Sequence, residues 1–126
     1  MDAEPGGSAL SEDVRAAVAA HLAAVGALDA EAVAAGFAAD AVFSTDDDEA
    51  VGQREVYALF RDAFAEVATV DMELARIVVA GDTAACELTQ RIRWRSGAML
   101  DLRLAAFYTV SGGLITRVRV YRFLPG

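Results

Sequence analysis

The most constraining feature of this sequence is a change of hydrophobic period near Thr69. Before it, apolar residues recur at the three- and four-residue intervals of helices, and after it apolar and polar residues alternate as they do in strands. The alternating part predicts four long strands joined by short Gly-containing turns, at residues 70–80, 83–95, 100–110 and 114–124. Helices followed by such a meander indicate an α+β fold, a cone-shaped curved antiparallel sheet with three N-terminal helices packed on its concave face.

The first 69 residues predict three helices and one short strand. Residues 1–10 are acidic and glycine-rich and are expected to form a disordered tail, so a single domain is expected over residues 11–126. Ser11 and Asp29 are residue types that cap helix N-termini. The expected elements are helices at 11–25 and 30–37, a strand at 41–45, a loop at 46–52 and a helix at 53–67.

Composition and charge exclude several classes of protein. The chain of 126 residues is 56% hydrophobic and carries a net charge of −8, which suits one globular domain and argues against nucleic acid as a partner. No apolar run approaches the ~18 residues of a membrane span, so no membrane contact and a cytoplasmic location are expected. One cysteine and one histidine exclude a disulfide framework and a multi-histidine metal centre, and no metal or cofactor is expected. The absence of lysine, with 28 alanines, is typical of a GC-rich bacterial genome.

Alternation along the strands separates an apolar face from an arginine-rich face. Even-numbered residues of the strands are expected to face the helices. In the last strand, this places Leu114 inward and Ile115 outward. The opposite, open face carries six arginines and three aromatic residues: Arg91, Arg93, Arg95, Arg103, Arg117, Arg119, Phe107, Tyr121 and Phe123. This face is either a solvated surface with cross-strand ion pairs or the interface of a homodimer, since arginine and aromatic residues are typical of interfaces.

Four polar residues fall on apolar faces and are candidates for a small-molecule site. His21 follows Val14 and Val18 on the inward stripe of the first helix, where it is either a catalytic group or a core histidine bonded to a carbonyl. Gln90, Tyr108 and Arg122 occupy inward positions of the strands, where burial without partners costs about 1–3 kcal/mol each. Such groups either converge on a ligand or reach the rim, and Arg122 has the further option of pairing with an acid of residues 46–49.

One acid and three aromatic residues complete the candidate set. Asp46 begins an acidic run after the first strand, where it is either a catalytic base near apolar walls or part of a solvated loop. Trp94, Phe60 and Phe43 are either core residues or the apolar walls that contact a flat ligand.

The order of elements, with "FAADAVF" after the second helix and "GGLITRVRVYRF" at the end, resembles the nuclear-transport-factor-like superfamily. That superfamily is the α+β cone shared by ketosteroid isomerase and the SnoaL-like polyketide cyclases. The resemblance places His21 at the position of the isomerase's oxyanion-hole tyrosine, and Thr45, beside Asp46, at the position of its base. The late-strand acid of the isomerase corresponds approximately to Ala106, and Arg122 stands where the cyclases commonly have an acid.

Two functions follow from these observations. The first is a small acid–base enzyme without a cofactor, an isomerase, cyclase or dehydratase that acts on an apolar carbonyl or polyketide-like molecule in the cone. His21 and Asp46 would share the proton, while Gln90, Tyr108 and Arg122 hold the substrate oxygen. The second is a non-catalytic module of the same fold that binds a small molecule or dimerises.

Overall fold

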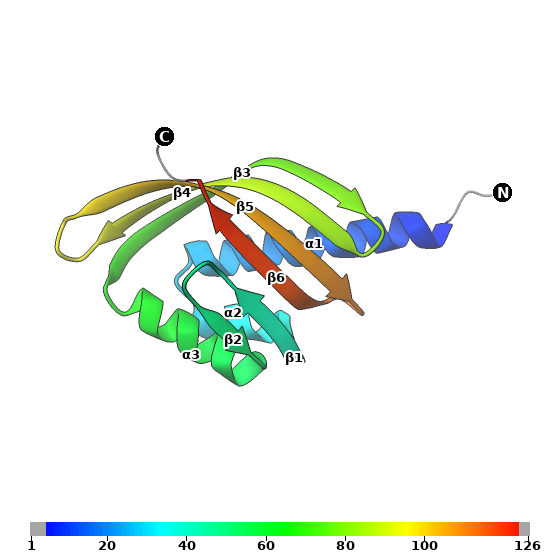
Figure 1. Ribbon diagram of the computed structural model, residues 1–126, viewed down its shortest axis with the longest axis horizontal. Helices are drawn as coiled ribbons and strands as arrows, with labels where there is room; N and C mark the ends of the chain where they lie inside the picture. Colours follow the sequence, from blue (N-terminus) through cyan, green and yellow to red (C-terminus); the bar gives the residue numbers. More distant parts are fainter. Residues whose placement is uncertain (1–4, 124–126) are drawn as a thin grey trace.

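The computed structural model describes residues 5–123 and confirms the α+β class. Its elements are α1 (Pro5–Gly26), α2 (Ala30–Ala35), β1 (Phe37–Ser44), β2 (Glu49–Val51), α3 (Gln53–Phe64), β3 (Val67–Ala80), β4 (Thr83–Trp94), β5 (Met99–Ser111) and β6 (Leu114–Arg122). The six strands form one sheet in the order β2-β1-β6-β5-β4-β3. Figure 1 shows β3 to β6 curving over α1, while α2 and α3 lie beside β1 and β2. No described helix is long and apolar enough to cross a membrane.

The sheet is mixed rather than wholly antiparallel. β3 to β6 form the expected antiparallel meander, but β1 pairs with β6 in parallel, and Phe43 lies opposite Val118. β2, which lies within the expected loop, pairs antiparallel with the outer side of β1. The parallel pairing brings the ends of β1 and β6 to the same edge of the sheet, and this determines which side chains meet there.

Three helix boundaries differ from expectation: the start of α1 and the ends of α2 and of α3, which ends at Phe64 because Val67 already belongs to β3. α1 begins at Pro5, so Ser11 lies inside the helix and is not its N-cap. Residues 5–10, expected in a disordered tail, belong to this helix, while residues 1–4 lie outside the described part of the chain. Proline is favoured in the first helical turn, because the N–H group it lacks has no partner there. α2 ends before Gly36, so Phe37 enters the sheet instead of the helix and is 1% exposed.

Burial confirms most of the inward assignments. Val14, Val18 and Val25 of α1 are buried, and they face the inward residues of the sheet, since α1 packs against β3, β4 and β5. Among the exceptions, Leu100 and Leu114 were expected to face inward but are 41% and 40% exposed, and Ile115 was expected to face outward but is buried. A bulge between Thr109 and Val110 shifts the register of β5 and β6, and a shift of one residue exchanges the faces of a strand.

Candidate functional site

The concave face of the sheet and the helices line a cavity of about 360 Å³. Six of the eight candidate residues line it: His21, Phe43, Phe60, Gln90, Tyr108 and Arg122. Aliphatic residues that alternation turns inward, such as Leu88 and Leu102, complete the walls. The cavity therefore has the size and the mostly apolar lining of small-molecule sites in proteins.

His21 is the most unusual group in the cavity wall. Its side chain is 8% exposed, and no described residue provides a hydrogen-bond partner for Nδ1. The ring is surrounded edge to face by those of Phe37, Phe60 and Tyr108, with centroids 5.6, 5.9 and 5.7 Å away. Burial in these apolar surroundings lowers the pKa of His21 to about 4. The imidazole is therefore neutral near pH 7, and its ring lines the cavity while its buried Nδ1 has no described partner.

Tyr108 and Gln90 add two polar groups to the same wall. Tyr108 is 2% exposed, and burial raises the pKa of its hydroxyl well above the usual range, so the phenol remains a hydrogen-bond donor. Gln90 lies opposite Leu102 on β5 and is half-buried at the cavity. The wall thus offers three neutral polar side chains to a ligand that enters between the aromatic rings.

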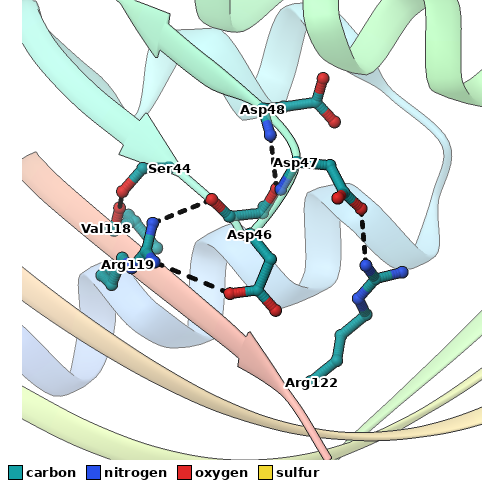
Figure 2. Close-up of polar contacts among 8 residues, drawn as sticks. Ser44, Asp46, Asp47, Asp48, Val118, Arg119 and Arg122 are labelled. Atoms are coloured by element: carbon teal, nitrogen blue, oxygen red, sulfur yellow. Dashed lines mark hydrogen bonds and ion pairs between the residues drawn. The ribbon is translucent and has the colours of Figure 1, made fainter. Parts of the chain in front are cut away.

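An ion pair stands at the mouth of the cavity. Arg122 Nη2 donates to Asp47 Oδ2 across 2.6 Å, joining the end of β6 to the loop after β1 (Figure 2). Asp47, Asp48 and Arg122 all line the cavity, so this pair belongs to the site and not only to the outer surface. The expected option that Arg122 pairs with an acid of residues 46–49 is confirmed, and parallel pairing of β1 with β6 is its cause.

The loop that carries Asp47 is a tight turn organised by Thr45. The Thr45 hydroxyl accepts hydrogen bonds from the backbone N–H groups of Asp47 and Asp48 at 3.2 and 3.1 Å, and Thr45 N donates to Asp48 O at 2.8 Å. Arg119 holds the same turn from outside, donating to Thr45 O at 2.8 Å and lying 3.7 Å from the Asp46 carboxylate (Figure 2). Thr45 itself reaches the cavity wall.

Two candidates lie away from the cavity. Asp46 is not among its lining residues, because the turn directs the Asp46 carboxylate towards Arg119 and leaves the mouth to Asp47 and Asp48. Trp94 ends β4 opposite Val67 and packs against the core beyond the cavity. The acidic run in the sequence marked this loop, but only the geometry of the turn distinguishes Asp47 and Asp48 from Asp46.

The outer face of the sheet carries a group of exposed aromatic residues. Phe107, Tyr121 and Phe123 are 44%, 42% and 50% exposed, and the rings of Phe107 and Tyr121 meet edge to face at 6.0 Å. Arginines cover two of these rings, with Arg119 4.7 Å from the Tyr121 ring and Arg103 5.8 Å from the Phe123 ring. We call Phe107, Tyr121, Phe123, Arg103 and Arg119 the outer patch.

A larger depression of about 740 Å³ lies along β3, β4 and β5 and is open to solvent. Its outward side chains are charged and pair with one another, as Arg91 does with Asp101 at 2.8 Å. Apolar side chains and neutral polar groups line most of the cavity on the concave face, which is therefore the better candidate for a small-molecule site.

Comparisons with known proteins agree with this architecture. An epoxide hydrolase of M. tuberculosis, described as LEH-like, superposes with a TM-score of 0.80 at 23% identity, covering 90% of this chain and 84% of its own. A ketosteroid isomerase-like protein from Catenulispora acidiphila, solved with trimethylamine, gives 0.77 at 19%, covering 83% of each chain. TerC, co-crystallised with polyporic acid, gives 0.77 at 14%, covering 88% of this chain and 92% of its own.

At these identities the structures establish the fold and not the chemistry. No curated protein sequence matches the chain. The family model for the SnoaL-like domain matches residues 18–118. This range contains all the residues that line the cavity except Val120 and Arg122. The chain therefore belongs to the family of SnoaL-like domains.

Proposed function

We propose that the protein is a cofactor-independent acid–base enzyme that isomerises, cyclises or dehydrates an apolar carbonyl compound in the cavity. The observation that carries this proposal is His21, a buried neutral imidazole whose Nδ1 has no described partner and whose ring lines a mostly apolar cavity. An unpartnered buried polar atom costs about 1–3 kcal/mol, and a ligand oxygen in the cavity would remove this cost.

The lowered pKa of His21 makes it a weak base, so it is better suited to bind the substrate oxygen than to accept a proton. A neutral imidazole carries one N–H donor, which can donate to a carbonyl oxygen, as can the hydroxyl of Tyr108 and the amide of Gln90. These hydrogen bonds strengthen as the oxygen becomes an enolate, which lowers the barrier to proton removal from the neighbouring carbon. The carboxylates at the mouth, Asp47 and Asp48, are better placed than Asp46 to accept that proton.

A thermal-shift screen followed by proton exchange tests the proposal. The panel contains phenols, enones, flat steroids and aromatic polyketides, and a ligand at 100 times its dissociation constant adds ~2.7 kcal/mol to the free energy of unfolding. Carbonyl hits are then incubated with the protein in D2O, and deuterium uptake at the carbon next to the carbonyl is followed by NMR. We expect uptake that His21→Phe abolishes while Trp94→Phe, outside the cavity, leaves it unchanged.

A second function, a binding module without catalysis, rests on the same cavity together with the outer patch. Ligands that bind tightly without deuterium uptake or turnover would support it over the enzyme. The outer patch favours assembly in either case, because exposed aromatic rings covered by arginine are typical of interfaces, and we propose a homodimer through this face.

A further inference from the structure

The charges at the mouth of the cavity indicate which small molecules it accepts. Arg122 is the one cation among the described residues that line the cavity, since His21 is neutral. Its side chain is 41% exposed, so the guanidinium is reachable from solvent as well as from the cavity. A guanidinium with several N–H donors binds a carboxylate or a similar anion in preference to a neutral group.

Asp47 occupies that guanidinium in the structure, and no other described side chain bonds to its carboxylate. Its side chain is 70% exposed, so the carboxylate can rotate away from Arg122 into solvent at a small cost in free energy. The loop does not depend on this carboxylate, because its shape rests on the Thr45 hydroxyl, the backbone of Asp48 and the two contacts of Arg119. Figure 2 shows that the two arginines contact different parts of the turn, Arg119 at Asp46 and Arg122 at Asp47. Arg119 also donates to the backbone oxygen of Thr45.

We propose that Arg122 is the anion-binding group of the cavity, and that Asp47 occupies it until a ligand with an apolar body and a carboxylate or phenolate displaces it. This inference rests on the proposed function, because it requires that the cavity bind a small molecule. It adds the substrate class: an apolar carbonyl compound that carries an acidic group. The apolar body lies against Phe43 and Phe60, and the acidic group lies at the mouth on Arg122.

The arrangement makes Asp47 a competitor that selects among ligands. A neutral compound enters without disturbing the ion pair between Asp47 and Arg122. An anion has to break this ion pair, but it then forms a similar ion pair with Arg122 itself. The free energy of an exposed ion pair of this kind corresponds to about a two- to fivefold change in an equilibrium constant. Removal of the competing Asp47 carboxylate should therefore change the dissociation constant of an anionic ligand by this factor.

Two fluorescent dyes with the same aromatic body test the inference. 1-Anilinonaphthalene-8-sulfonate carries an anionic group, and N-phenyl-1-naphthylamine has the same rings without it. Both are titrated at pH 7 and low salt into the wild type, Asp47→Asn, Asp48→Asn, Arg122→Gln and the double variant Asp47→Asn with Arg122→Gln. Asp48→Asn is the matched control, since Asp48 lines the same mouth and loses the same charge but does not pair with Arg122.

We expect Asp47→Asn to tighten binding of the sulfonate by about two- to fivefold, and Asp48→Asn to tighten it less. Arg122→Gln should weaken sulfonate binding, and Asp47→Asn should then bring no gain in the Arg122→Gln background. The neutral dye should bind all five proteins with the same affinity. Equal gains from Asp47→Asn and Asp48→Asn, or a gain that persists without Arg122, would show a general charge effect and overturn the inference.

A further variant separates this inference from the proposed function. Ala63 is exposed on α3 and lines the cavity, so Ala63→Trp places a large ring there from a position where it does not disturb the core. If the neutral dye binds the wild type and not Ala63→Trp, the cavity is a binding site, and the sulfonate data alone decide the role of Arg122. If neither dye binds, or if Ala63→Trp binds both as well as the wild type does, the cavity is not a binding site and both proposals fail.

Discussion

The ring of His21 lies with its centroid 5.7 Å from that of Tyr108, edge to face, although the two residues are 87 positions apart in the chain. The contact joins the inward stripe of α1 to the C-terminal part of β5. It puts the imidazole in an apolar environment whose physical consequences are measurable without knowledge of the substrate.

We expect His21→Phe to preserve or increase the free energy of unfolding, by up to about 1 kcal/mol, while it abolishes ligand binding or turnover. The change removes a buried nitrogen that has no described partner and retains an aromatic ring among Phe37, Phe60 and Tyr108. Urea unfolding followed by circular dichroism measures the stability. A loss of more than 2 kcal/mol would show that Nδ1 has a structural partner in solution.

Stability should fall as the pH is lowered from about 6.5 to 4. The pKa of His21 is about 4 in the folded protein and 6.5 in the unfolded chain, so the unfolded state binds more protons in this interval. The free energy of unfolding therefore decreases on acidification, by about 3 kcal/mol in total from this residue. Urea unfolding at a series of pH values measures the slope, and His21→Phe should remove it over this interval. A slope that survives in His21→Phe would belong to other groups.

Gln53→Ala should destabilise the fold by about 1–3 kcal/mol without changing the cavity. The Gln53 Nε2 group donates to Ala34 O at 2.8 Å and to Phe37 O at 3.2 Å, and so ties the start of α3 to the end of α2 and the start of β1. The alanine variant leaves both carbonyl groups without this donor. Arg54→Ala, one residue further along the same helix and exposed, is the control and should be within about 0.5 kcal/mol of the wild type.

Tyr121→Asp should convert the proposed homodimer into a monomer at micromolar concentration. The ring of Tyr121 lies at the centre of the outer patch, between Phe107 and the guanidinium of Arg119, where a carboxylate would replace an apolar contact. Leu114→Asp, at an equally exposed position by the turn between β5 and β6, is the control and should leave assembly unchanged. Sedimentation velocity distinguishes the two states. A wild type that sediments as a monomer would rule out assembly through the outer patch.

Local periodicity was sufficient to predict the fold class and most of the cavity wall. Val14, Val18 and His21 follow helical spacing, and the even-numbered residues of β4 and β5 follow the alternation of strands, so their faces were predicted from neighbouring residues alone. His21, Gln90 and Tyr108 were recognisable as polar residues at these apolar positions, and the structure places all three on the cavity. The inward placement of Phe43 and Phe60 has the same local origin.

The tertiary structure decided the features that depend on pairing between distant segments. The parallel pairing of β1 with β6 brings Asp47 to Arg122, and the bulge opposite Val110 exchanges Leu114 and Ile115. Neither has a signal in the local pattern, since a register is set by which backbone groups meet across the sheet. Asp46, Asp47 and Asp48 are the same residue type at adjacent positions, so the sequence does not distinguish them. The turn around Thr45 orients the Asp46 carboxylate towards Arg119 and leaves the other two at the mouth of the cavity. The sequence alone thus determined the residues that build the wall of the cavity, whereas its charged mouth arose from non-local pairing of the chain.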